Sequence, residues 1–213
     1  MKKLVYLFSL LLTANFIFIS CSGDDDIDPI VTDPTVTDTG VMIGGARWAT
    51  RNVDAPGTFA ATPTDAGMFF QWNRQRGWPA TGTVANWNTT ADVVGIEWGA
   101  SNDPCPPGWR VPTEADFISL QSAGGEYVTV SGVSGFRFGI APNQVFFPFI
   151  GVRLPFTGYL NVDFNAYWSS TRVNIGIPGE EFLAQSLFFI NTIPHVVADI
   201  RRTGLPVRCV KRN

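Results

Sequence analysis

The sequence predicts an α+β domain of short strands, one or two short helices and long irregular loops. Glycine and proline are frequent, with 21 and 15 residues, and aromatic residues make up 13% of the chain. No long stretch shows helical periodicity. Glycine and proline mark turns, and short apolar runs between them indicate strands. Residues 41–213 are numerous enough to form a single domain with its own core.

The clearest helix is predicted to begin after Thr113. Its hydroxyl can cap the helix, and acidic residues follow in the first turn, as in a capping box. Phe117 and Leu120 lie three residues apart and are expected to face the core. The pair Gly124–Gly125 is expected to end the helix.

Strands are expected on both sides of this helix. Phe136, Phe138 and Ile140 alternate with Arg137 and Gly139, which is typical of a half-buried strand. The residues from Met42 to Trp48 are expected to form a first edge strand. Further strands are predicted over Gln144–Arg153, Ala166–Thr171, Leu183–Ile190 and Leu205–Val210.

Residues 1–20 have the order of a secretory signal: basic Lys2 and Lys3, an apolar run over 4–19, and small Ser20. The cysteine that follows, Cys21, resembles the acylation site of a lipobox. This resemblance implies cleavage before Cys21 and a lipid anchor on it, so that the membrane is a partner. The alternative is an uncleaved N-terminal membrane anchor.

Residues 21–40 are expected to form an acidic, flexible tether, because they are rich in Asp, Thr and Pro and poor in apolar surface. An acidic run after the lipidated cysteine resembles the lipoprotein export signal of Bacteroidetes. The resemblance implies display on the outer face of the outer membrane. The alternative is a solvated spacer that carries no address. The tether aspartates are Asp24, Asp25, Asp26, Asp28, Asp33 and Asp38.

The charge of the folded part argues against a nucleic-acid partner. The chain has 15 basic and 18 acidic residues, and 13 basic and 12 acidic ones remain without Lys2, Lys3 and the tether aspartates. The domain is thus near +1, without the clustered charge that phosphate binding requires. All its basic residues except Lys211 are arginines, and several are expected to pin loops to carboxylates or carbonyls.

The domain has two cysteines, Cys105 and Cys209, and an exported protein meets an oxidising environment. A bridge between them would close a loop of roughly 100 residues, worth on the order of 4–5 kcal/mol in the chain-entropy model. The alternative is two free thiols acting as metal ligands or as a nucleophile. The only histidine, His195, has no second ligand at metal-binding spacing.

Five sequence blocks in order resemble the Fibrobacter succinogenes major paralogous domain family. The resemblance implies a C-type-lectin-like fold of the kind shared with formylglycine-generating enzymes, and it supports the pairing of Cys105 with Cys209. The blocks are Arg47–Val53, Gly67–Asn73, Cys105–Thr113, Tyr167–Thr171 and Gly204–Val210.

Neither catalysis nor a cofactor is expected. The formylglycine-generating relatives use cysteines that a disulfide would occupy here, and His195 has no triad partners. Neighbouring Glu180 and Glu181 would point to opposite faces of an extended segment. Calcium-dependent lectins use a carboxylate-Pro-Asn motif, whereas Ala141–Asn143 lacks the carboxylate, so no metal site is expected.

Ligand binding is expected on loops, and the best candidate is the stretch from Arg172 to Arg202. The sequence therefore predicts a surface-displayed binding module of adhesin type, whose partner is a glycan or a protein. The alternative is a structural or accessory subunit of a surface appendage, and an enzyme is disfavoured. The candidate ligand-binding residues are Arg172, Asn174, Glu180, Glu181, Asn191 and His195.

Overall fold

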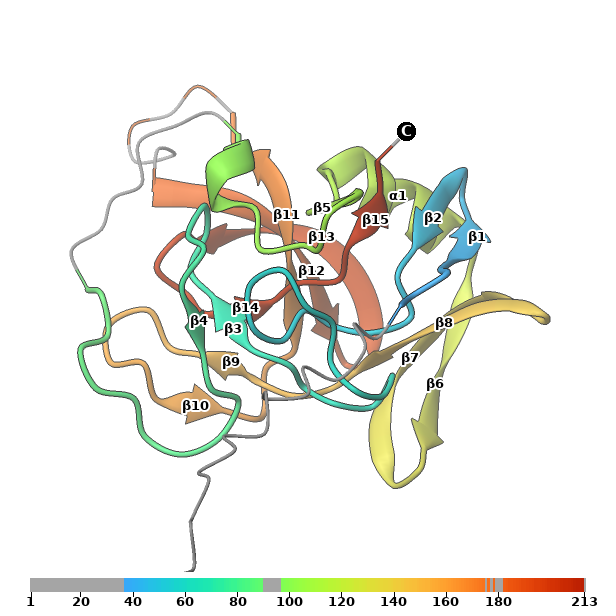
Figure 1. The fold of residues 1–213 in the computed structure, drawn as a ribbon, viewed down its shortest axis with the longest axis horizontal. Coiled ribbons are helices and arrows are strands. Elements are labelled where there is room, and N and C mark those ends of the chain that lie inside the picture. The colour runs from blue at the N-terminus through green and yellow to red at the C-terminus, as the bar shows by residue number, and fades with distance from the viewer. Residues whose placement is uncertain (1–36, 90–96, 175, 177, 179–181, 213) are drawn as a thin grey trace, which may run out of the picture. The chain divides into compact units, whose positions relative to one another are not determined.

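A computed structural model describes residues 37–89, 97–174, 176, 178 and 182–212 (Figure 1). The predicted signal peptide, Cys21, most of the predicted tether, Glu180 and Glu181 lie outside the described residues. The described part is mostly β-structure in several small sheets, with one α-helix, which confirms the predicted mixture of short strands and a helix. None of its helices is long and apolar enough to cross a membrane.

The elements of the described part are short. Its helical elements are the 3₁₀ turn η1 (Ala100–Asn102) and the helix α1 (Glu114–Ser122). Its strands are β1 (Val41–Ile43), β2 (Ala46–Trp48), β3 (Phe69–Phe70), β4 (Gly77–Trp78), β5 (Trp109–Arg110), β6 (Gly125–Val130), β7 (Val133–Ile140), β8 (Asn143–Pro148), β9 (Val152–Arg153), β10 (Leu160–Asn161), β11 (Ala166–Arg172), β12 (Leu183–Ile190), β13 (Ile193–Ile200), β14 (Leu205–Pro206) and β15 (Val210–Lys211).

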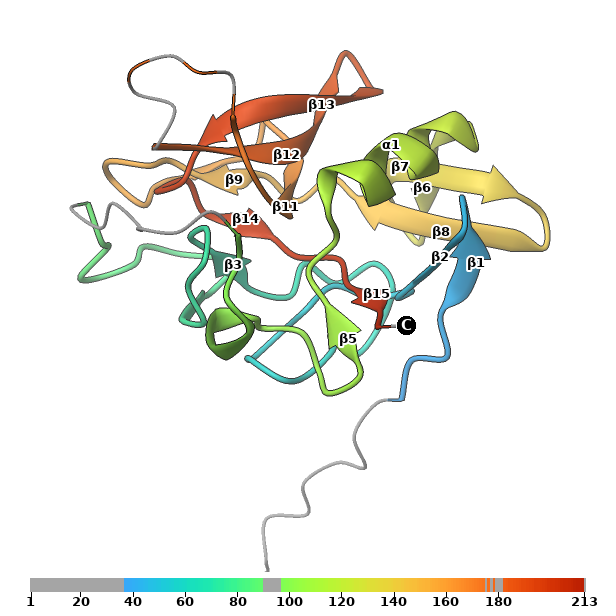
Figure 2. The same cartoon turned by 90° about the horizontal axis from the view of Figure 1, so that it is seen from above.

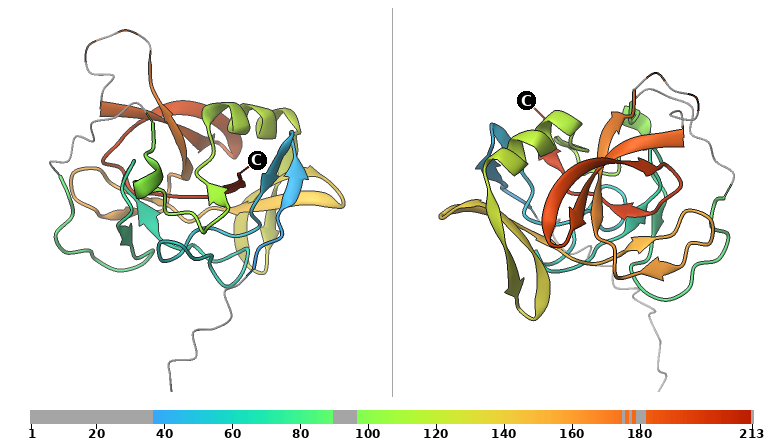
Figure 3. Two further views of the ribbon diagram at one scale, coloured as in Figure 1. Left: turned by 45° about the horizontal axis from the view of Figure 1, so that its top comes forward. Right: turned by 180° about the vertical axis from the view of Figure 1, so that it is seen from behind.

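The strands form five sheets, and two of them join the beginning of the domain to its end. These two have the strand orders β1-β2-β15-β5 and β14-β3-β4. The long hairpins form the sheets β6-β7-β8 and β11-β12-β13, and β9 pairs with β10. Figure 3 shows the β6–β7 hairpin projecting beyond the other sheets.

The helix α1 begins and ends where the sequence predicts. The Thr113 hydroxyl accepts a hydrogen bond from Asp116 N at 3.2 Å, and the Asp116 carboxylate accepts one from Thr113 N at 2.7 Å, which completes a capping box. Phe117 and Leu120 are fully buried, and Gly124 follows with a φ of +70°. The helix packs against β11, β12, β13 and β7 (Figure 2).

Strand β11 separates two hydrophobic clusters. Ala166 and Trp168 face one cluster, which contains the disulfide, and Tyr167 faces the other, which contains α1 and the β6–β8 sheet. The alternation follows from the two-residue period of a strand. Both large aromatics have a polar partner, because Trp168 Nε1 donates to Phe70 O at 2.7 Å and the Tyr167 hydroxyl donates to Pro148 O at 2.7 Å.

Several predicted strands differ from the observed ones. The expected edge strand from Met42 to Trp48 is a hairpin of β1 and β2, because Gly44 and Gly45 adopt positive φ between them. Gln144–Arg153 and Leu205–Val210 each contain two short strands instead of one. Ile140 is not half-buried, since 79% of it is exposed at the end of β7, beyond the packed part of the sheet. The edge strands β6 and β13 were not predicted.

Buried arginines hold loops as the sequence predicts. Arg153 is fully buried and donates hydrogen bonds to four carbonyl oxygens. They belong to Pro79, Thr81, Gly82 and Gly158, at distances of 2.6–3.2 Å. One side chain thereby fixes both the loop after β4 and the connection from β9 to β10.

The folded part extends further towards the N-terminus than the predicted boundary at residue 41. Asp38, which the sequence places in the tether, is buried. Its carboxylate accepts hydrogen bonds from Gly40 N at 2.8 Å, from Thr50 N at 2.7 Å and from the Thr50 hydroxyl at 2.9 Å. Asp38 thus links the residues before β1 to the segment after β2 through these hydrogen bonds.

Candidate functional site

A pocket of about 640 Å³, with mostly charged and polar residues in its lining, lies at the end of β11. It forms where this strand meets the segment leading into η1, the connection from β5 to α1, and the C-terminal end of the chain. Its size is within the range of sites for small molecules. The lining residues are Glu97, Trp98, Gly99, Ala100, Asp103, Arg110, Val111, Thr113, Ser170, Thr171, Arg172, Asn174 and Arg212.

The end of β11 is held by hydrogen bonds to two other segments. Trp98 N donates to Ser170 O at 3.2 Å. Ser170 N donates to Pro112 O at 2.7 Å, and Glu114 N donates to the Thr171 hydroxyl at 3.0 Å. Because these bonds fix its backbone, this extended segment forms a firm wall of the pocket.

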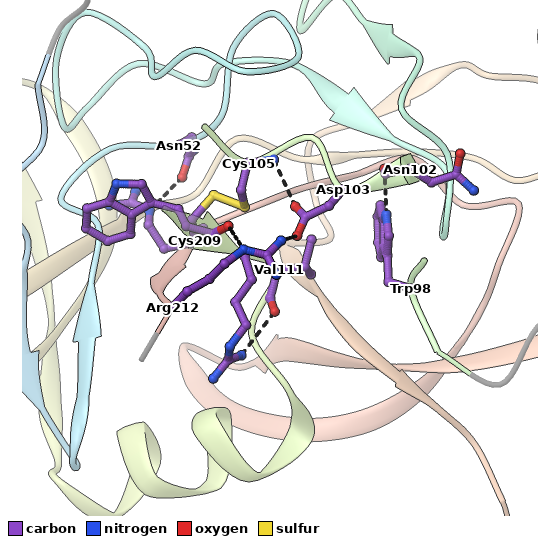
Figure 4. The surroundings of a disulfide bond; sticks show 11 residues. Asn52, Trp98, Asn102, Asp103, Cys105, Val111, Cys209 and Arg212 are labelled. Atoms are coloured by element: carbon purple, nitrogen blue, oxygen red, sulfur yellow. Dashed lines mark hydrogen bonds and ion pairs between the residues drawn. A yellow bond between two sulfur atoms is a disulfide. The ribbon is translucent and has the colours of Figure 1, made fainter. Parts of the chain in front are cut away.

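The opposite wall depends on the predicted disulfide, which is confirmed. Cys105 and Cys209 are joined with a Cα–Cα distance of 6.0 Å. Next to the bridge, Asp103 Oδ2 pairs with Arg212 Nη2 at 2.8 Å, and Asp103 Oδ1 accepts a hydrogen bond from Cys105 N at 2.9 Å (Figure 4). Arg212 Nε also donates to Trp109 O at 2.8 Å. The disulfide therefore brings together a charged pair that lies 109 residues apart in sequence.

A second hollow of about 270 Å³ shares Ala100, Asp103 and Arg212 with the pocket. The Asp103–Arg212 ion pair therefore borders both spaces. The second hollow is otherwise lined by Gln75, Cys105, Trp109 and a rim of proline and glycine residues. It offers few side chains that could bind a ligand, so the larger pocket is the candidate site.

Two Asp–Arg pairs border the pocket, and their carboxyl groups differ in pKa. Burial raises the pKa of Asp103, and the hydrogen bond from Cys105 N and the charge of Arg212 offset only part of this effect. Burial also acts to raise the pKa of Asp116. There, hydrogen bonds from Arg110, at 2.7 Å, and from Thr113 outweigh it and lower the pKa.

Four polar side chains in the lining have no hydrogen bond or ion pair with any residue in the described part of the chain. They combine one cation, one carboxylate, one amide and one hydroxyl. A guanidinium only donates hydrogen bonds, a carboxylate only accepts them, and the other two groups do both. They are Arg172, Glu97, Asn174 and Ser170. The pocket thus presents unsatisfied groups of each kind to a ligand.

The structure brings only some of the predicted ligand-binding residues together. Arg172 and Asn174 line the pocket. Asn191 is exposed in the turn between β12 and β13, with a φ of +49°, and His195 is exposed on β13 opposite Phe188. Glu180 and Glu181 lie outside the described residues.

The stretch from Arg172 to Arg202 contains a regular hairpin. Strand β12 confirms the strand predicted over Leu183–Ile190, whereas β13 was not predicted. These two strands form a continuous antiparallel hairpin from Leu183 to Ile200. Asn191 and His195 therefore lie on a hairpin and not on an irregular loop.

Other lining residues were missed by the sequence reasoning, although two of them had a signal. Asp103 lies two residues before Cys105, and Arg212 lies three residues after Cys209. A disulfide between the cysteines places these opposite charges close together. Glu97, Arg110 and Ser170 had no such signal, because their approach depends on how β11 passes between two loops.

The described residues contain no group of three or more His, Cys, Asp or Glu side chains that could hold a metal ion. Residues Ala141 and Pro142 form the tight turn between β7 and β8, away from the pocket lining. Comparison of the chain with protein-family models, with curated proteins and with solved structures finds no match.

Proposed function

We propose that the protein is a surface-displayed lipoprotein whose domain binds a glycan in the pocket at the end of β11. The observation that carries this proposal is the set of four unsatisfied polar side chains in a concave site of about 640 Å³. Small-molecule sites combine such a volume with a few placed polar groups. Arg172 and Asn174, which the sequence had selected, belong to this set.

A glycan suits this lining better than a protein surface does. Sugars present adjacent hydroxyl groups that both donate and accept hydrogen bonds. The planar side chains of Arg172, Asn174 and Glu97 can each engage two neighbouring polar atoms. Protein interfaces are larger, and their cores are enriched in aromatic and apolar side chains. The pocket instead has a lining in which charged and polar residues predominate.

Binding without catalysis fits the state of the carboxyl groups. Both oxygens of Asp103 are engaged, one by Cys105 N and one by Arg212. This leaves Glu97 as the carboxylate in the described lining that has no partner. A pair of free carboxylates, as most glycosidases require, is therefore not offered by these residues.

We further propose membership of the Fibrobacter succinogenes major paralogous domain family, with a C-type-lectin-like fold. Two of the five resembling blocks carry the disulfide cysteines, and a third, Tyr167–Thr171, forms most of β11. The pocket lies where these blocks meet. Lectin-like domains use irregular segments held by a rigid sheet for recognition, and Glu97–Asn102 is such a segment here.

Lipid anchoring at Cys21 is tested by mass spectrometry of the protein extracted from membranes. We expect a mature N-terminus at Cys21 that carries fatty acyl chains, and a Cys21→Ser variant that is neither cleaved nor acylated. An N-terminus at Met1 in the wild-type protein would contradict the proposal. Protease treatment of intact cells then shows whether the domain faces the exterior.

Glycan binding is tested by probing a glycan array with the full chain in detergent. We expect binding to a defined set of glycans that persists in EDTA, because the described residues offer no cluster of metal ligands. The double variant Arg172→Ala/Asn174→Ala should lose this binding. Binding that needs a metal ion, or that survives the double variant, would contradict this site.

A second candidate, an accessory subunit of a surface appendage, is favoured by one observation. The segment from β9 to β11 exposes four large apolar side chains, which is the kind of surface that contacts another protein. These are Phe156, Tyr159, Val162 and Phe164. Two results together would favour this candidate. The protein would bind no glycan on the array, and a partner that co-purifies with the wild-type protein would be lost from a Phe156→Ser/Tyr159→Ser variant.

A further inference from the structure

The lining of the pocket contains more hydrogen-bond donors than acceptors that remain unused. Arg172 has five N–H donors and no partner among the described residues. Arg212 uses Nε and Nη2 for Trp109 O and Asp103, which leaves Nη1 unused. Against these donors, Glu97 is the carboxylate of the described lining that has no partner. A ligand that satisfies the lining must therefore bring acceptors.

The charges of the lining residues also favour a ligand that brings acceptor oxygens. Three arginines line the pocket, Arg110, Arg172 and Arg212, against two carboxylates, Glu97 and Asp103. Asp103 is already paired with Arg212 at 2.8 Å, and Arg110 is paired with Asp116 at 2.7 Å. Both pairs are pre-formed, so Arg172 is the lining cation that forms no ion pair among the described residues.

The backbone that carries Arg172 is fixed by hydrogen bonds of the neighbouring residues. Ser170 and Thr171, just before it, are hydrogen-bonded to Trp98 N, Pro112 O and Glu114 N. The Arg172 backbone also pairs with Ala184 of β12. With the backbone fixed, binding has to order only the side chain of Arg172, and its planar guanidinium is pre-organised for two parallel hydrogen bonds to a carboxylate or sulfate.

From the donor excess, the unpaired cation and the fixed wall we infer that the pocket is specific for anionic glycans, with the acidic group of the sugar held by Arg172. This inference rests on the proposed glycan-binding function and names the ligand class for the same site. A carboxylate and a sulfate share the required chemistry, namely two or more acceptor oxygens with a negative charge. The two sources are distinguished by the test below.

The test measures the affinity of the full chain in detergent for matched ligand pairs by isothermal titration calorimetry. For the carboxylate, trigalacturonate is compared with its methyl ester; for the sulfate, dextran sulfate is compared with dextran. We expect at least one acidic ligand to bind about tenfold or more tightly than its neutral counterpart. Added salt should weaken this binding.

Variants of the same protein separate the role of Arg172 from general charge. Arg172→Gln should reduce the affinity for the acidic ligand about tenfold or more, and Arg172→Lys should restore only part of it, because the ammonium lacks the planar fork. Glu97→Gln should increase the affinity. Arg137→Gln serves as the matched control: it removes one positive charge from β7, where Arg137 pairs with Glu126 outside the pocket, and should change nothing.

The outcomes separate the two proposals. Equal affinity for the acidic and neutral members of both pairs, with an effect of Arg172→Ala/Asn174→Ala on both, would overturn the anionic specificity and leave glycan binding standing. An equal loss in Arg172→Gln and Arg137→Gln would show binding by overall charge and would also overturn the inference. No binding to these ligands or to any glycan on the array would overturn both proposals.

Discussion

The two halves of the core are stabilised by different means. The cluster around α1 and the β6–β8 sheet is built from strands of six to eight residues and from packed aromatic rings, such as Trp48 against Phe117 at 5.4 Å between centroids. The cluster around the disulfide includes residues of the longer β11 and β12, but its other strands, β3, β5, β9 and β14, have two residues each. Two indole groups of this cluster donate to backbone carbonyls, Trp72 Nε1 to Ser169 O at 2.9 Å and Trp168 Nε1 to Phe70 O at 2.7 Å.

This difference shows why the pocket lies where it does. Long paired strands use their backbone groups on each other and leave few of them for a ligand site. Two-residue strands leave backbone groups that loops, arginines and the disulfide must satisfy and position. Binding sites on irregular segments need such a fixed frame. In the disulfide half, these additional bonds stabilise the irregular segments, and the pocket lies in this half.

Removal of the disulfide should have the largest effect. The bridge joins residues with a sequence separation of 104. The double variant Cys105→Ala/Cys209→Ala should therefore lower the free energy of unfolding by on the order of 4–5 kcal/mol in the chain-entropy model. Denaturant unfolding measures the loss. Hydrogen exchange should rise most around residues 97–112 and 203–212, with less change in β6–β8. A uniform rise across both halves would show that the halves are not stabilised separately.

Leu120→Ala is the corresponding change in the other half. Leu120 is fully buried on α1 among aromatic residues, so its truncation should reduce the free energy of unfolding by about 3 kcal/mol. The pocket should keep its ligand affinity under conditions where the variant is folded. Ser122→Ala, at an exposed helix position, is the matched control and should change stability little. Loss of affinity in folded Leu120→Ala protein would show that the helix half shapes the site.

The smallest expected change in stability comes from the titration of the two carboxyl groups beside the pocket, Asp103 and Asp116. The pKa of Asp116 is lowered, so its ionised form stabilises the fold above its unfolded pKa, and this contribution disappears as the pH falls through the folded value. The pKa of Asp103 is raised, so its protonated form stabilises the fold below its unfolded pKa. This contribution is lost as the pH rises through the folded value.

The matched variants test this difference in sign. Asp116→Asn should destabilise the protein by about 1 kcal/mol at neutral pH and less in acid, because the charge-assisted bonds to Arg110 and Thr113 are weakened. Asp103→Asn should cost less at neutral pH than Asp116→Asn does. Thermal unfolding across pH 3–8 measures both (a range set by the carboxyl titrations). Parallel pH profiles for the two variants would contradict the assignment.

The elements that the sequence predicted well are those with local chemistry. Thr113 as the capping residue, the buried Phe117 and Leu120, and the apolar end of β12 from Leu187 to Ile190 can each be recognised from a few neighbouring residues. The edge strands β6 and β13 were missed because they are largely exposed, and Pro194 interrupts the strand pattern of β13. Strands of two residues, such as β3 and β5, are too short to give a periodic signal.

The candidate site was predictable only in part, for a similar reason. Arg172 and Asn174 could be chosen because they follow a recognisable strand. The loop that contributes Glu97 and Trp98 pairs with Thr171 and Ser170 across more than 70 residues of sequence. No local pattern encodes that approach, since it results from how the whole chain packs.

The disulfide also determines how the protein responds to mechanical tension. The chain between Cys105 and Cys209 cannot be drawn out while the bridge is intact, which shields on the order of 350 Å of contour length. Arg110, Ser170, Arg172 and Asn174 all lie within this shielded segment. When the N-terminal end is pulled, only the residues before Cys105 and the few after Cys209 can extend. A ligand bound at the proposed site would therefore be held by a segment that does not lengthen under tension.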